Sequence, residues 1–141
     1  FMKIYIGSDH AGYELKHYLM DNFKDVEFKD VGYLELNKDD DYPSVAHDLS
    51  NKVLTENGIG VLICGTGLGM CMAANRHKGI RGANCLTSEM ATMARKHNNA
   101  NILCLSARLL KQEDTLEILK TFLNTEFEGG RHERRVELLD K

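Results

Sequence analysis

Short apolar runs alternate with longer segments of helical period along the chain, and this alternation constrains the fold more than any other feature. The runs cover residues 3–7, 26–31, 60–64, 80–85 and 102–105. The intervening segments carry apolar residues on one helical face, as Val45, Leu49 and Val53 do. This rhythm of repeated βαβ units predicts a doubly wound, Rossmann-like α/β fold with a five-stranded parallel sheet and helices on both faces.

Several residues mark where the helices should begin and end. Pro43 fits the first turn of a helix that ends at Asn57, and Thr87 or Ser88 is suited to cap the helix through His97. The acidic stretch at residues 38–41 is expected to be a loop. A Gly-Gly pair at 129 and 130 should separate the last helix from a charged, C-terminal helical tail at residues 131–141.

Size and charge exclude several classes of protein. The 141 residues fit one domain, residues 1–141, and the net charge of -3 lacks the field that would hold nucleic acid or an anionic membrane. No apolar run approaches the roughly 20 residues that span a bilayer. The four cysteines have no CxxC spacing, so we expect a reduced, cytoplasmic chain without a metal.

A glycine loop follows the most apolar of the predicted strands. In such sheets ligands bind beyond the carboxyl ends of the strands, and Gly65, Gly67 and Gly69 lie between a strand and a helix there. Their backbone N–H groups can converge on an anion. The loop lacks the Lys of a phosphate loop, and Met70 stands where a dinucleotide motif has its third glycine. Two interpretations remain open: an anion or oxyanion site, and a tight structural turn.

Cys64 is the cysteine best placed for chemistry. It ends the buried strand directly before the loop and the next helix, where the helix dipole favours a thiolate. The alternative is a small core residue, which is the interpretation we adopt for Cys71, Cys85 and Cys104.

Among the six histidines, His10 and His97 are predicted to approach the ligand-binding edge of the sheet. Asp9 is suited either to orient a histidine or to cap the following helix. His132 belongs to a basic run that is usually a solvated helix face. Arg131 and Arg135 are four residues apart in this run, so they also fit a phosphate clamp.

Taken together, these segments resemble the ribose-5-phosphate isomerases of type B, a family that also contains the galactose-6-phosphate isomerase subunits. The resemblance extends over nearly the whole chain. It is carried by Ser8-Asp9-His10-Ala11-Gly12, Asp41-Tyr42-Pro43, Cys64-Gly65-Thr66-Gly67-Leu68-Gly69 with Ala73-Ala74-Asn75-Arg76, Gly79-Ile80-Arg81, His97-Asn98-Asn99-Ala100-Asn101 and Gly129-Gly130-Arg131-His132-Glu133-Arg134-Arg135.

The resemblance implies interconversion of ribose 5-phosphate and ribulose 5-phosphate through an enediolate, without a metal or another cofactor. It makes Cys64 the base, and His97 with Asp9 the group that opens the sugar ring. Thr66 and the backbone of the loop would form an oxyanion site, while Tyr42 and Asn98 would contact the sugar. The loop residues implied in substrate binding are Gly65, Thr66, Gly67, Leu68 and Gly69.

For the phosphate, the resemblance implies His10, Arg108, Arg131 and Arg135. It also implies a homodimer or tetramer with shared active sites, in which the segment around His97, Asn98 and Arg108 faces a neighbour's glycine loop. Some relatives carry a glutamate base where this chain has Met70. Two alternatives stay open: a hexose-phosphate isomerase acting on allose 6-phosphate or galactose 6-phosphate, and a non-catalytic flavodoxin-like module that binds sugar phosphates.

Overall fold

A computed structural model describes residues 2–31 and 41–141 of the chain. Its strands are β1 (Met2–Ser8), β2 (Val26–Asp30), β3 (Ile59–Cys64), β4 (Gly82–Asn84) and β5 (Ile102–Ser106). Its helices are α1 (Tyr13–Asn22), α2 (Tyr42–Glu56), α3 (Leu68–Ala74), α4 (Ser88–Asn98), α5 (Gln112–Leu123) and α6 (Arg131–Glu137), followed by the 3-10 turn η1 (Leu138–Asp140). The predicted alternation of strands and helices is confirmed, as is the helical tail.

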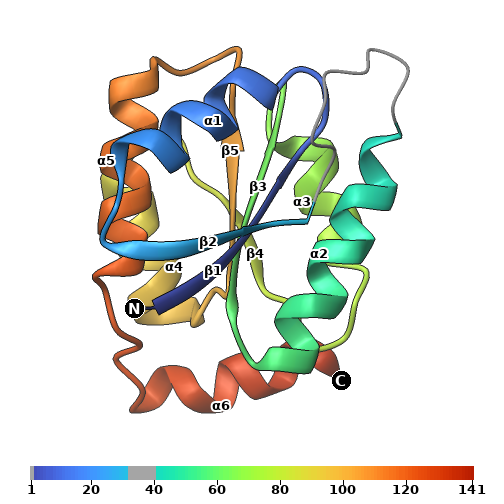
Figure 1. Ribbon diagram of the computed structural model, residues 1–141. Helices are drawn as coiled ribbons and strands as arrows, with labels where there is room; N and C mark the ends of the chain where they lie inside the picture. The colour runs from blue at the N-terminus through green and yellow to red at the C-terminus, as the bar shows by residue number, and fades with distance from the viewer. Residues whose placement is uncertain (1, 32–40) are drawn as a thin grey trace.

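The strands form one parallel sheet in the order β2-β1-β3-β5-β4 (Figure 1). Strand β3 lies between β1 and β5, with Ile63 opposite Ser8 and Cys64 opposite Ser106. Its residues from Val61 to Cys64 are buried, as a parallel strand covered on both faces requires. This register brings the carboxyl ends of β1, β3 and β5 to the same edge of the sheet.

Strand β4 is shorter than the predicted run at residues 80–85. The Asn101 side chain accepts the backbone N–H of Arg81 at 2.7 Å, while the N–H of Asn101 is donated to the Arg81 carbonyl. Because these bonds occupy Arg81, regular pairing with β5 begins only at Gly82. Strand β4 is therefore shorter than predicted because the Asn101 side chain takes the place of a backbone hydrogen bond between the two strands.

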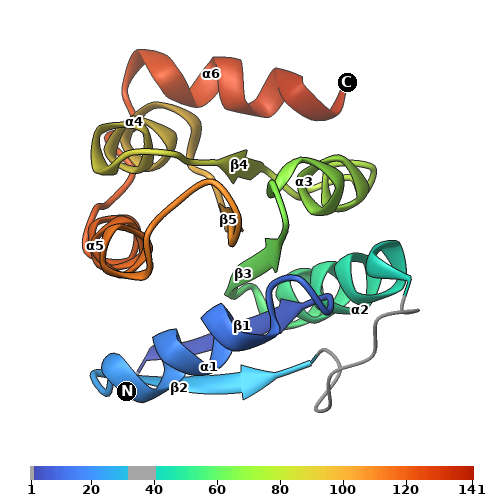
Figure 2. The ribbon, with the colours of Figure 1, turned by 90° about the horizontal axis from the view of Figure 1, so that it is seen from above.

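Helices cover both faces of the sheet, as predicted. One core contains residues of α1, α4 and α5, and the other contains residues of α2 and α3 (Figure 2). Two of the predicted helix boundaries are seen directly. The hydroxyl of Thr87 caps α4 by accepting the N–H of Met90, and Asn57 ends α2 in the left-handed conformation.

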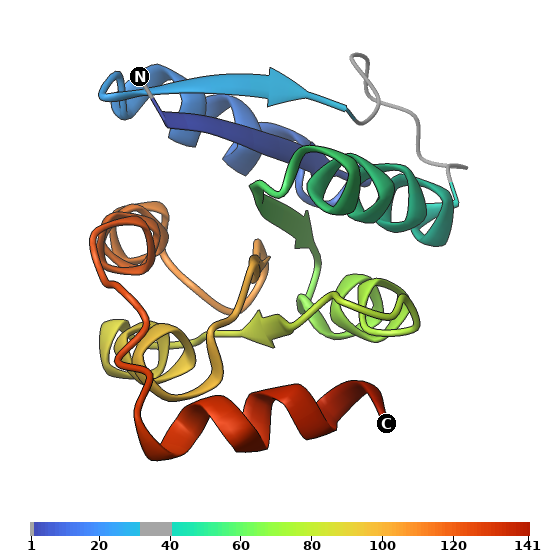
Figure 3. The same ribbon diagram turned by 90° about the horizontal axis from the view of Figure 1, so that it is seen from below.

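Helix α6 lies outside these layers, alongside α4, and carries the chain end across the β4 edge (Figure 3). The Asp140 carboxylate holds this end by accepting the backbone N–H of Gly79 at 3.1 Å. Of the predicted acidic loop, only Asp41 is among the described residues, and its carbonyl accepts the N–H of Ser44 at the start of α2. No helix in the described ranges has the length and apolar character needed to cross a membrane.

Candidate active site

The glycine loop turns the end of β3 into the start of α3 around the Cys64 thiol. Gly67 has a φ of 83°, a conformation that glycine adopts without strain, and it donates its N–H to Cys64 Sγ at 3.2 Å. Thr66 Oγ1 accepts the N–H of Leu68 at 3.2 Å. An N–H donated to sulfur stabilises negative charge there. Two of the N–H groups predicted to face an oxyanion are thus directed at side chains of the loop itself.

Two glycines of the loop allow large side chains to approach the backbone. A Cβ at Gly65 would lie 3.0 Å from the Arg108 guanidinium, and a Cβ at Gly69 would lie 2.6 Å from the Tyr42 ring. Arg108 and Tyr42 therefore contact the glycine loop of their own chain. The resemblance implies that Arg108, with the segment around His97 and Asn98, faces a neighbour's glycine loop, and the structure adds a contact with the loop of its own chain. The reason is local, since Arg108 follows β5 at the carboxyl edge and its N–H is donated to the Gly65 carbonyl at 2.9 Å.

Ser106, to which the sequence assigned no role, anchors the loop to β5. Its buried hydroxyl donates to the Gly65 carbonyl at 2.7 Å and accepts the N–H of Leu109 at 3.0 Å. These bonds join the backbone after β3 to the turn after β5. The signal in the sequence was a serine that ends an apolar strand at the ligand-binding edge.

Asp9 and His10 follow β1 at the same edge. The N–H of Asp9 is donated to the Ile63 carbonyl at 3.3 Å, and the Asp9 carboxylate accepts the N–H of Gly12 at 3.1 Å. A Cβ at Gly12 would lie 2.6 Å from the Ile63 carbonyl oxygen, so only glycine lets α1 start this close to β3. Gly12 itself is the N-cap residue of α1, so its bond to the Asp9 carboxylate supports the turn that leads into the helix and does not itself satisfy a helical N–H group. Asp9 follows Ser8, which pairs with Ile63, so it leaves β1 at the edge where Cys64 ends β3.

A cavity borders this group. It lies between the start of α2 and α3, has a volume of about 630 Å³, and is lined by Tyr42, Pro43 and Gly69 among others. The cavity reaches the glycine loop at Gly69, while Cys64, Asp9 and Arg108 are not among its lining residues. The carboxyl edge itself combines a buried thiol, a carboxylate and a guanidinium. The predicted site residues that meet here are Asp9, His10, Tyr42, Cys64, Gly65, Thr66, Gly67, Leu68, Gly69 and Arg108.

The remaining predicted residues lie elsewhere in the chain. Helix α4 starts after β4 and runs back along the sheet, so His97 and Asn98 lie near the amino end of β5. Ile102 and Ser106 at the two ends of β5 are four residues apart, about 13 Å along the strand. The prediction that His97 approaches the carboxyl edge is wrong within one chain. A helix that connects parallel strands must return to the opposite edge.

His97 instead meets the start of α6. Its ring stacks on the His132 ring, with centroids 4.3 Å apart and an interplanar angle of 17°. His132 is buried, which contradicts its interpretation as part of a solvated face, while Arg131 and Arg135 beside it are exposed. Burial, together with the positive charges on His97 and Arg131, lowers the pKa of His132. The sequence signal was the spacing of His132 and Val136, which places both on the inner face of α6.

Two of the other cysteines behave as core residues. Cys85 and Cys104 are buried, and burial raises the pKa of the Cys85 thiol to about 12. These two residues confirm the prediction, because a thiol that stays protonated in an apolar setting is inert. Cys71 differs: it is half-buried, and a hydrogen bond with Cys104 lowers the pKa of its thiol.

The structure is that of an α/β protein with a buried thiol and a glycine loop at the carboxyl edge of its sheet. A second group, which contains His97 and His132, lies where the end of α4 meets α6. The family of ribose/galactose isomerases matches residues 4–139. The chain belongs to this family and is a sugar-phosphate isomerase.

Individual relatives agree with this assignment. A probable ribose-5-phosphate isomerase B from Mycoplasma pneumoniae is 46% identical over 136 residues, which cover 94% of this chain and 90% of the relative. The crystal structure of a ribose 5-phosphate isomerase from Thermotoga maritima is 47% identical, with a TM-score of 0.95 over 99% of this chain and 97% of the other. Ribose-5-phosphate isomerase B from Mycoplasma genitalium, solved with bound ribulose-5-phosphate, is 40% identical, with a TM-score of 0.94 over 98% and 93% of the two chains.

Proposed function

We propose that residues 1–141 act as one domain that interconverts ribose 5-phosphate and ribulose 5-phosphate through an enediolate, without a metal. The observation that carries this proposal is the Cys64 thiol, held at the carboxyl edge with its sulfur accepting the Gly67 N–H. In a sugar-phosphate isomerase, a thiolate poised in this way is suited to be the base. The bound ribulose-5-phosphate of the Mycoplasma genitalium relative supports the choice of substrate.

The chemistry begins with opening of the sugar ring. His97, assisted by Asp9, moves the proton of the C1 hydroxyl to the ring oxygen, so that the bond between C1 and this oxygen breaks and an aldehyde forms. The Cys64 thiolate then takes the proton from C2, and the electron pair moves toward the C1 oxygen to give the enediolate. The proton of the C2 hydroxyl then moves to the C1 oxygen, and the Cys64 thiol returns the carbon-bound proton to C1, which leaves a carbonyl at C2 and produces the ketose.

Negative charge develops on the sugar oxygens during this proton transfer. Thr66 and the backbone N–H groups of residues 65–69 would stabilise that charge, with the N–H of Gly67 divided between the sulfur and the sugar. Tyr42 and Asn98 would contact the sugar hydroxyls. His10, Arg108, Arg131 and Arg135 would hold the phosphate, because guanidinium groups bind phosphate oxygens in pairs. The three arginines supply the local positive charge that a chain of net charge -3 needs in order to bind an anionic substrate.

The active site is proposed to be shared between two copies of the chain. Cys64 and Asp9 lie at one edge of the sheet, whereas His97 and Asn98 lie near the other. A second subunit that presents its His97 group to the first subunit's Cys64 would complete the site. Large apolar side chains are exposed on α3 and α4 beside the loop, among them Met72, which is 68% exposed. An exposed apolar face of this kind is suited to an interface between subunits.

The test is ketose formation from ribose 5-phosphate, measured beside allose 6-phosphate and galactose 6-phosphate, with a chelator present. Cys64→Ala should abolish turnover, and Cys71→Ala, which removes a thiol one turn into α3, should keep it. Preference for a hexose phosphate would replace the proposed substrate. Loss of activity with the chelator would contradict metal independence. Inactivity on all three sugar phosphates would contradict the proposed isomerase activity and favour a non-catalytic module that binds sugar phosphates.

A further inference from the structure

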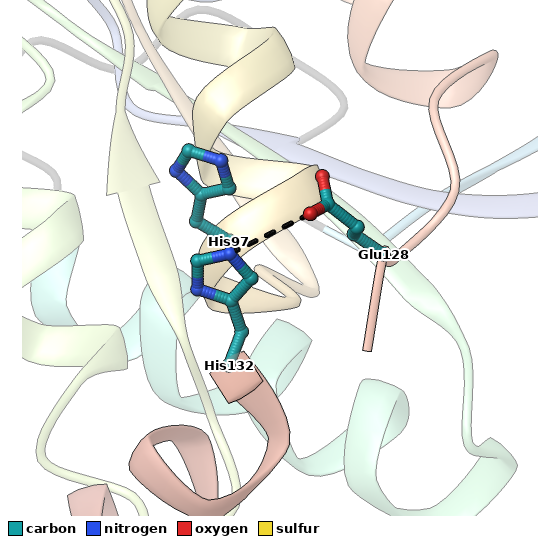
Figure 4. A group of neighbouring side chains, drawn as sticks. All are labelled: His97, Glu128 and His132. Carbon is teal, nitrogen blue, oxygen red and sulfur yellow. Dashed lines mark ion pairs between the residues drawn. The ribbon is translucent and has the colours of Figure 1, made fainter. Parts of the chain in front are cut away.

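Three side chains from distant parts of the sequence converge beside α6. His97 comes from the last turn of α4, Glu128 from the segment after α5, and His132 from the first turn of α6. One ligand atom from each residue lies within 4.8 Å of the other two. Figure 4 shows the two rings one above the other, with the Glu128 carboxylate directed toward them. We refer to these three residues as the His-His-Glu cluster.

The backbone holds the cluster in place. The N–H of Glu128 is donated to the Lys96 carbonyl at 3.1 Å, which fixes Glu128 against the end of α4. The N–H of His132 is donated to the Gly129 carbonyl at 3.1 Å, so the ring leaves the first turn of α6 in a set direction. Ring stacking fixes His97 against His132. The three ligand atoms therefore lie near one another, and the near-parallel rings must turn for both nitrogens to face one ion.

The His132 ring provides a second, independent observation. The side chain is 7% exposed, and its Nε2 is buried without a hydrogen-bond partner among the described residues. The Glu128 carboxylate is 3.8 Å from this nitrogen, which is too far for a hydrogen bond. Buried polar atoms are nearly always partnered, so an orphaned imidazole nitrogen that faces a carboxylate and a second imidazole indicates a missing ligand.

We propose that the His-His-Glu cluster binds a divalent transition-metal ion of the zinc class. Two imidazoles and one carboxylate form a donor set of catalytic zinc sites, which keep a fourth position for water. Ligand atoms around tetrahedral zinc lie about 3.3 Å apart, so distances of up to 4.8 Å in the cluster must contract by up to about 1.5 Å. Glu128 is half-exposed and free to rotate toward the rings. Exposed Arg131 and Arg135 oppose a cation, but solvent screens their charges.

The consequence for activity rests on the proposed function of His97. A metal ion bound to the His97 ring nitrogen occupies the lone pair that ring opening requires. Metal binding would therefore inhibit the isomerase reversibly, and a chelator would restore turnover. The ion acts here as an inhibitory ligand and is not required for the reaction.

The experiment measures binding and inhibition separately on the full chain. Co²⁺ is titrated while its visible absorption is followed, Zn²⁺ is titrated by calorimetry, and turnover of ribose 5-phosphate is measured in the same solutions. Glu128→Gln removes one ligand, and Glu133→Gln is the matched control because it removes the same charge from an exposed position nearby on α6. Both variants should keep full turnover without metal.

We expect one metal ion per chain, the absorption of tetrahedral Co²⁺, and binding weakened about tenfold or more in Glu128→Gln but not in Glu133→Gln. Inhibition should weaken by the same factor. Equal binding by wild type and Glu128→Gln would overturn the site while leaving the proposed function intact. Binding that depends on Glu128 without any loss of turnover would overturn the inhibitory role and count against His97 as the ring-opening group.

Discussion

Replacing Gly67 by alanine tests how the loop holds the Cys64 thiol. Gly67 has a φ of 83°, which costs a residue with a side chain about 1–2 kcal/mol. The new Cβ would also lie 2.5 Å from Asn84 Oδ1, and such overpacking costs about 1–3 kcal/mol more. Gly67→Ala should therefore destabilise the fold by about 2–5 kcal/mol. Displacing the N–H that reaches Cys64 Sγ should also lower turnover about ten- to hundredfold.

Gly129→Ala is the matched control for the cost of a positive φ without a steric clash. Gly129 has a φ of 72° and open space around its Cα, so alanine there should cost only about 1–2 kcal/mol and leave turnover unchanged. Urea unfolding and ketose formation are measured for both variants. Adding Asn84→Ala to Gly67→Ala should recover the steric part of the stability loss. Equal destabilisation by the two glycine variants, or full turnover in Gly67→Ala, would refute this account of the loop.

Three further predictions concern the phosphate group, the loop anchor and pH. Arg135→Ala should raise KM about tenfold or more and change unfolding free energy by less than about 0.5 kcal/mol, checked by kinetics and urea unfolding. Ser106→Ala should destabilise the fold by about 1–3 kcal/mol, because two hydrogen bonds to a buried hydroxyl are lost, and unchanged unfolding would contradict this. Burial and the charge of His47, whose Nδ1 lies 2.7 Å from His77 Nε2, lower the pKa of His77. Since the unfolded chain then binds more protons, stability should fall below about pH 6.5, with a smaller fall in His77→Gln.

Features of the site that depend on neighbouring residues could be predicted from the sequence. The glycine loop, the position of Cys64 at the end of β3 and the Thr87 cap each depend on contacts within a few residues. The apolar run of β3 indicated a strand buried on both faces, and the structure confirms it. Local geometry of this kind is repeated in many proteins, so residue type and spacing are enough to predict it.

Contacts between distant segments could not be predicted in the same way. Lys16 of α1 is fully buried and pairs with Asp30 at 2.8 Å, whereas lysine side chains are almost never fully buried unless they are paired. His132 is buried because α6 packs on α4. Its spacing from Val136 marks an inner face of α6 but does not indicate which helix covers that face. The prediction for His97 failed because it located the end of α4 in the sequence without asking which edge of the sheet that end reaches. A helix between two parallel strands runs from the carboxyl edge back to the amino edge, so its last turn, with His97, lies at the amino edge.

The most direct test of the shared active site mixes two inactive variants, Cys64→Ala and His97→Gln, under conditions that allow subunits to exchange. Each mixed dimer then has one site with an intact Cys64 from one chain and an intact His97 from the other. Random exchange makes half of the dimers mixed, so about a quarter of wild-type activity should return, because cyclic symmetry gives each dimer two such sites. If exchange is verified and the mixture remains inactive, both residues act within one chain and the shared site is wrong.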